Sequence, residues 1–347
     1  MEKFEDIRVL EPITHNKDKV YTTPPIEKLV TLDFNENTKW NDDKLPKQIL
    51  EYGKIPPLDI YDLHAVGIDG TGVNVAIIDQ PLALAHPEYK DNVVSYKTYA
   101  PQGRTLPISS MHGPAVASLL VGKQIGTAPK AKLHYYAVPS WLRDSIYPAR
   151  ALEDIVEQNK KLPDEEKIKF VSVSACHSGK ASVFKNSKYW DEAMEKAKKA
   201  GILVLEVTAE NGFISPGYID YMDKSFKYGY PNAHKDRNKD NVYIPNSLRT
   251  VAECYDNKNF SYTYWGVGGV SWAIPYATGV LCLGQQVNPN LSAVRLKQIF
   301  IETAKKNDNI VAPKTFIEEV KKTLEINANE EDIYIHHKGK TKFNLFV

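Results

Sequence analysis

The chain has 347 residues, of which 42% are hydrophobic and 25% are charged, and these values are ordinary for a globular protein with a sizeable core. Its 44 lysines and arginines nearly balance its 43 aspartates and glutamates, so composition gives no electrostatic reason to expect nucleic acid or an anionic membrane as a partner. The first twenty residues contain no signal-peptide core, and no stretch approaches the ~20 apolar residues of a membrane span. We therefore expect a cytoplasmic protein without nucleic-acid or membrane partners, and nothing in the sequence indicates its oligomeric state.

The first part of the chain differs in composition from the rest. Residues 1–59 are polar, rich in proline and charge, and weakly periodic. We expect them to form an extension that packs on a following domain, with regular structure beginning around Leu63. A small apolar set offers the contact, and it consists of Ile26, Leu29, Val30 and Leu32. The expected domain covers residues 60–325, and residues 326–347 form a tail.

Beyond the extension, short β-branched runs alternate with helical patterns. Strands are predicted at 73–78, 132–137, 170–174 and 202–207, and helices at 113–121, 151–160, 190–200, 272–286, 293–303 and 314–324. This alternation predicts an α/β fold of three layers, with a central, mostly parallel sheet flanked by helices. In such sheets active sites lie at the carboxyl ends of the strands.

Three segments carry residues with catalytic chemistry, and each has a structural alternative. Asp79 directly follows the strand VNVAII, where an aspartate often only binds backbone N–H groups of a turn. His112 stands at the start of an apolar helix, where a lone histidine is more often a hydrogen-bonded core residue. Ser271 opens another apolar helix, where serine commonly acts as an N-cap. A nucleophile gains from this last position too, because helix-terminal N–H groups stabilise a neighbouring oxyanion.

Taken together, the segments match a known set of motifs. The matching residues are Asp79 with His86-Pro87-Glu88-Tyr89 seven residues on, His112-Gly113-Pro114-Ala115-Val116-Ala117, Gly126 to Ala131, and Gly269, Ser271, Ala273, Pro275 and Gly279. They resemble the signature blocks of the subtilisin-like serine peptidases, in the same Asp, His, Ser order. The resemblance covers roughly residues 60–325 and implies a subtilisin-like three-layer fold.

The resemblance also implies an activity and the residues that perform it. The chain is expected to be a serine endopeptidase that acts on a peptide or protein without a cofactor. In this interpretation Ser271 is the nucleophile, His112 is the general base and Asp79 orients the base. A substrate-lining strand is carried over as well, and it comprises Ser172, Val173, Ser174 and Ala175.

The oxyanion position is the main departure from the family. An ungapped count from Gly201 places Glu210 where the family has an asparagine, and a carboxylate there would repel the developing charge. A one-residue bulge instead places the Asn211 amide at that position, and we favour Asn211 with Glu210 as the alternative. The alternative function is a catalytically weak or silent relative that binds peptides or a protein partner in the same cleft.

The remaining motifs give weaker signals. Three cysteines, an odd number, are expected to be free buried thiols, and Cys176 and His177 should point to opposite faces of an extended strand. The pair His336-His337 has no third ligand, so no metal site is predicted. The aromatic-rich segment 211–241 is expected to be a long connection that either lines the substrate cleft or packs on itself at the surface.

Overall fold

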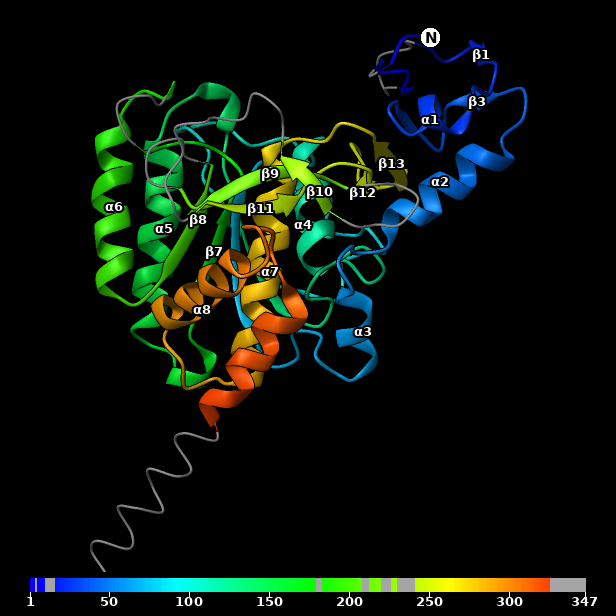
Figure 1. Ribbon diagram of the computed structural model, residues 1–347. Coiled ribbons are helices and arrows are strands. Elements are labelled where there is room, and N and C mark those ends of the chain that lie inside the picture. The colour runs from blue at the N-terminus through cyan, green and yellow to red at the C-terminus, as the bar shows by residue number, and fades with distance from the viewer. Residues whose placement is uncertain are drawn as a thin grey trace, which may run out of the picture.

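The computed structural model describes residues 1–3, 5–9, 16–178, 183–207, 212–219, 226–229 and 241–324. Its centre is a layered α/β unit, beside which the N-terminal segment lies next to strand β13 (Figure 1). The predicted boundaries of the extension, the domain and the tail, after residues 59 and 325, stay a prediction. The predicted tail, residues 326–347, lies outside the described part of the chain.

Five parallel strands form the central sheet. Their order is β5 (Val93–Thr98), β6 (Lys132–Ala137), β4 (Asn74–Asp79), β7 (Phe170–Val173) and β8 (Leu203–Glu206). β4 is completely buried because both faces of the sheet are covered, which explains its continuous apolar run. The fold class and the four predicted strands are confirmed. The edge strand β5 was missed because it is only half-buried and carries polar residues.

Helices cover both faces of this sheet (Figure 1). α5 (Ile146–Asn159) and α6 (Ser187–Lys199) pack on one face, and α4 (His112–Val121) and α7 (Val270–Val287) pack on the other. α8 (Ala293–Lys305) contacts α7, and residues 313–324 form a further helix. Two short 3₁₀ helices, η1 (Ser140–Leu142) and η2 (Asp164–Glu166), flank α5. The predicted helices are confirmed, although α5 begins five residues before its predicted start.

The alternation of side chains along β4 determines on which face of the sheet its last residue, Asp79, lies. Ala76 and Ile78 pack in the cluster of α5 and α6, whereas Val75 and Ile77 pack in the cluster of α4 and α7. Because side chains alternate along a strand, Asp79 falls on the α4 and α7 side.

Smaller sheets replace two regions that we expected to be irregular. Within the predicted long connection 211–241, β9 (Ile214–Ile219) pairs antiparallel with β10 (Phe226–Gly229) and parallel with β11 (Val242–Pro245). The described part of the predicted connection therefore contains two strands that we did not expect, β9 and β10. β12 (Arg249–Glu253) and β13 (Ser261–Trp265) then form an antiparallel hairpin that leads into α7.

Regular structure begins well before Leu63, contrary to prediction. The early elements are β1 (Val20–Tyr21), α1 (Ile26–Leu29), β2 (Asp33–Asn35), β3 (Lys39–Trp40), α2 (Lys44–Lys54) and α3 (Ile60–Ala65). β2 adds to the hairpin by pairing antiparallel with β13. Leu29 and Leu32 are completely buried in one cluster with Leu248 and Tyr264, so the predicted packing of the extension is confirmed. These elements escaped prediction because most of them are short, and because β2 forms only by pairing with a strand more than 200 positions away.

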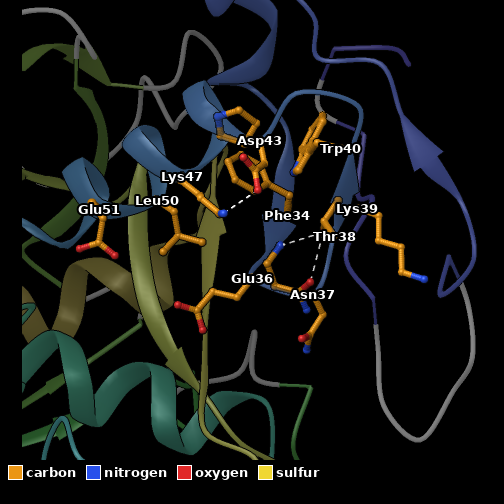
Figure 2. A pocket seen from close by; sticks show the side chains of 12 residues that line it. Phe34, Glu36, Asn37, Thr38, Lys39, Trp40, Asp43, Lys47, Leu50 and Glu51 are labelled. Atoms are coloured by element: carbon orange, nitrogen blue, oxygen red, sulfur yellow. Dashed lines mark hydrogen bonds and ion pairs between the residues drawn. The ribbon is translucent and has the colours of Figure 1, made fainter.

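The extension also encloses a cavity of about 610 Å³ between α2 and the turn that joins β2 to β3 (Figure 2). Phe34, Trp40 and Leu50 supply apolar walls, and the ion pair of Lys47 with Asp43 lies at its rim. All of its lining residues fall between positions 34 and 51, so it is separate from the predicted catalytic residues.

Asp33 links the extension to the segment that follows β13. Its carboxylate accepts a hydrogen bond from the Gly266 backbone N–H at 2.9 Å. Burial raises the pKa of Asp33 to about 6, and the Asp6 carboxylate adds to this rise, while Gly266, Arg8 and Val267 oppose it. The folded protein therefore holds a proton on Asp33 at pH values where the unfolded chain has released it.

We expect Asp33→Asn to stabilise the protein at pH 7.5 and to have little effect at pH 4. Because the folded pKa lies above the unfolded value of 3.8, the stability contribution of this group falls as pH rises from about 4 to 6 and stays low above that. Asparagine keeps an oxygen for Gly266 without the charge, so the expected gain in unfolding free energy is about 1–3 kcal/mol. Thermal unfolding at both pH values measures it. Asp18→Asn, at a side chain that is 97% exposed, should change neither value.

Candidate active site

Asp79 and His112 form a buried pair at the carboxyl edge of the sheet. Asp79 ends β4 and His112 begins α4, and both elements contribute to the same hydrophobic cluster. The Nδ1 atom of His112 lies 2.7 Å from Asp79 Oδ1, and the two side chains are only 15% and 6% exposed. Because Nδ1 faces a carboxylate, the neutral ring carries its proton there, which leaves Nε2 as a proton acceptor.

The charge of Asp79 tunes the basicity of His112. Burial lowers the pKa of the imidazole, but the Asp79 carboxylate and its hydrogen bond raise it by more, so the pKa lies above the usual 6.5. The ring is therefore suited to accept a proton near neutral pH and to remain paired as an imidazolium.

Ser271 is fixed by a reciprocal contact with Ser174. Pro275 is the sixth residue of α7 and has no N–H to bond the Ser271 carbonyl four residues earlier. The Ser174 hydroxyl donates to that carbonyl at 2.9 Å instead, and the Ser271 hydroxyl donates to the Ser174 carbonyl at 3.4 Å. The hydrogen bond that Pro275 cannot make is thus replaced by the one from Ser174.

Trp272 links the start of α7 to the Asp79 and His112 pair. The ring of Trp272, the residue after Ser271, packs on the His112 ring with centroids 5.3 Å apart. A cavity of about 290 Å³ is lined by Asp79, His112 and Ser174 among others. The Ser271 hydroxyl donates to the Ser174 carbonyl in this structure.

Of the four residues of the predicted substrate strand, Ala175 is partly exposed and the other three are buried. Ser172 and Val173 are 1% and 0% exposed, because β7 is an inner strand with helices on both faces. Their part in substrate binding stays a prediction. Ser174 and Ala175 line the cavity next to His112, so they remain predicted substrate contacts. The oxyanion candidates Glu210 and Asn211 lie outside the described residues.

His177 also lines the cavity and was missed as a site residue. Its Nδ1 lies 3.2 Å from Ser145 Oγ, and its ring packs against Phe184 and Trp190. Burial lowers its pKa to about 4, although the Asp79 charge acts in the opposite direction, so the ring is neutral at physiological pH. Nothing in the sequence distinguishes this histidine from an ordinary core residue, because its position depends on the β7 to α6 connection.

The remaining sequence predictions concern the cysteines, a metal site and membrane spans. All three cysteines are free, but only Cys254 and Cys282 are buried, because Cys176 is partly exposed. No group of three or more His, Cys, Asp or Glu side chains that suits a metal occurs in the described ranges, and His336 and His337 lie outside them. No helix in the part of the chain that the structure describes is long and apolar enough to cross a membrane.

Comparison with known proteins identifies the family to which the chain belongs. The sequence profile of the subtilase family (Peptidase_S8) matches residues 70–248, so the chain belongs to the subtilases, a family of serine peptidases. Subtilisin BL of Lederbergia lenta is 24% identical over 249 residues, which are 70% of this chain and 86% of that protein. The extracellular serine protease of Aeromonas sobria is 36% identical over 85 residues, which cover 22% of this chain but only 14% of the protease.

A solved structure of the subtilase cytotoxin SubAB shows the same fold. It superposes with a TM-score of 0.58 and 16% sequence identity, and the match covers 81% of this chain and 99% of that chain. At this identity the likeness concerns the fold.

We expect Gly268→Ala to displace the segment that carries Ser271. Gly268 has φ of +66°, which disfavours any side chain, and an added Cβ would overlap the Asn246 carbonyl oxygen. The expected loss of unfolding free energy is about 1–3 kcal/mol, measurable by chemical denaturation. Gly269→Ala is the matched control, because Gly269 has an extended backbone and open space at its Cβ position. Equal effects of the two substitutions would contradict this account of the turn.

Proposed function

We propose that this chain is a serine endopeptidase in which Ser271 is the nucleophile, His112 is the general base and Asp79 orients His112. The observation that carries the proposal is the buried Asp79 and His112 pair, which shares a cavity with the residue that binds Ser271. Membership of the subtilase family supports the same chemistry.

The proposed reaction follows from the free nitrogen of His112. Nε2 takes the hydroxyl proton of Ser271 while Oγ attacks the substrate carbonyl carbon, and the carbonyl oxygen becomes an oxyanion. The resulting imidazolium is stabilised by Asp79, which explains why the pKa of His112 is raised. The imidazolium then gives its proton to the leaving amine as the peptide bond breaks. Water, deprotonated by His112, hydrolyses the acyl-enzyme and restores Ser271.

Substrate is proposed to be a peptide or protein that enters the cavity beside His112. Ser174 and Ala175 stand at the end of β7, where an extended chain can lie along the exposed strand end. The Ser271 backbone N–H belongs to the first turn of α7, where N–H groups have no acceptor within a helix, so it is one proposed oxyanion donor. Asn211 is the proposed second donor.

A catalytically silent relative is the second candidate. The hydrogen bond of the Ser271 hydroxyl to the Ser174 carbonyl favours it, because a nucleophile held in this way is not poised toward His112. Apo structures of active enzymes, however, often have long or misaligned catalytic hydrogen bonds that tighten with substrate. A covalent probe separates the two candidates.

We expect a fluorophosphonate probe to label the wild-type protein and Ser271→Ala to lose labelling and peptidase activity by about 10³-fold or more. The probe reports the activated hydroxyl directly and needs no knowledge of the substrate. Ser292→Ala is the matched control, since Ser292 caps the start of α8 by accepting the Arg295 N–H. If Ser271 had only a structural role in the first turn of α7, where Gly269 is the N-cap, neither substitution would affect labelling. An unlabelled wild type would favour the silent relative.

We expect Asn211→Ala to lower turnover by ~10²–10³ with little change in KM, because its amide would contact the oxygen mainly once charge develops. Glu210→Ala should be mild. Steady-state kinetics on a fluorogenic peptide measure both. The reverse pattern would place Glu210 at the oxyanion position and contradict the bulge that we propose.

A further inference from the structure

The first residues of the chain lie along the outer edge of β2. The Ile7 N–H donates to the Asp33 carbonyl at 2.9 Å, and the Asp33 N–H donates to the Glu5 carbonyl at 3.1 Å. Ile7 is completely buried, and Arg8 is 8% exposed. Residues 5–9 therefore extend the sheet of β12, β13 and β2 by one more paired segment, of which residues 7–9 are buried in the protein.

Arg8 is directed toward the end of β13. Its guanidinium is held by two hydrogen bonds to Asp6, from Nε at 2.9 Å and from Nη2 at 2.7 Å. The guanidinium carbon lies 4.1 Å from the centre of the Trp265 ring, in the geometry of a cation–π contact. Because the group is largely buried, this contact is stronger than one at an exposed surface.

Trp265 continues the contact toward the active site. Its ring meets the Trp272 ring edge-on with centroids 5.6 Å apart, and Trp272 in turn packs on the His112 ring at 5.3 Å. Trp272 directly follows Ser271 in α7. We call Arg8, Trp265 and Trp272 the aromatic stack, and it connects the N-terminal segment to the proposed base.

The backbone between β13 and α7 is held by the same segment. The Asp33 carboxylate binds the Gly266 N–H, and the Tyr264 hydroxyl donates to the Val30 carbonyl at 3.0 Å. Gly266 lies so close to the extension that an added Cβ would be 2.5 Å from the Thr31 carbonyl carbon. The five residues that precede Ser271 thus start from a point fixed by residues 30–33.

We propose that residues 5–9 and β2 are a positioning element of the active site, and that Arg8 acts through the aromatic stack on His112 and on the α7 start. Arg8 is a positioning residue, since its measured contacts are with Asp6 and Trp265. The catalytic part of this inference rests on the proposed function, whereas its effect on the His112 ring does not.

The stack has a measurable consequence for His112. Trp272 packs against the imidazole with ring centroids 5.3 Å apart, and burial of the imidazole lowers the pKa of His112 against the pull of Asp79. The other charged or titratable groups beside it are Asp79, His177 and Arg143, which line the same cavity. Loosening the stack admits water and weakens the lowering effect, so the pKa of His112 should rise.

The test compares Arg8→Met with Arg8→Lys. Methionine keeps an apolar stem but removes the charge, whereas lysine restores a cation over Trp265. We expect Arg8→Met to slow fluorophosphonate labelling of Ser271 by about tenfold and to lower kcat while KM stays within about twofold. Arg8→Lys should recover most of the rate. Lys19→Ala, which removes a cation–π contact with Tyr21 elsewhere in the extension, should behave as wild type.

A second measurement does not depend on activity. The His112 ring is titrated by NMR in wild type and Arg8→Met, with His112→Gln assigning the resonance and thermal unfolding confirming that Arg8→Met folds. An upward shift of the His112 pKa in Arg8→Met supports the inference even if the wild type takes no label, in which case only the proposed function fails. An unchanged His112 pKa in Arg8→Met overturns the inference. If the wild type takes label, labelling of Arg8→Met at the wild-type rate overturns it as well. If Arg8→Met does not fold, the same comparison is made with Arg8→Lys, whose weaker contact should give a smaller shift in the same direction.

Discussion

The burial of α7 is the constraint on which the site depends. Its residues from Trp272 to Gln285 are all buried, and the helix contains no charged residue, so it packs on every side. Gly279 lets it approach closely to the connection between α4 and β6, because an added Cβ there would lie 2.5 Å from the Thr127 Cβ. A helix enclosed in this way cannot shift along its axis without opening the core. The position of its first turn, and hence of Ser271, is fixed relative to the sheet.

That first turn is also where the helix lacks a hydrogen bond of its own. Pro275 leaves the Ser271 carbonyl without a helical partner, and Ser174 at the end of β7 fills the vacancy. The helix start is therefore bonded to the same edge of the sheet that carries Asp79. A local defect in helix bonding thus joins two parts of the site that are almost 100 residues apart in sequence.

The N-terminal segment completes the support from the opposite direction. It adds a strand to the hairpin that leads into α7 and places Arg8 and Asp33 beside the connecting residues. Burying these charges is costly unless they are paired, and each has a partner in Asp6 or Gly266. The arrangement ties the stability of the extension to the geometry around Ser271. In this interpretation the extension belongs to the proposed active site as much as the sheet does.

The sequence by itself determined the α/β class, the inner strands and helices, and three candidate residues, because continuous apolar runs and short motifs are local signals. It did not indicate β2, β5 or β9. β2 is short and pairs with a strand more than 200 positions away, β5 carries polar residues, and β9 contains proline and glycine. The place of Ser174 at the cavity and the burial of Ser172 were likewise decided by how β7 packs in the structure. Only the tertiary structure brought Arg8 to Trp265, because such a contact depends on two chain segments folding together and leaves no pattern in either one.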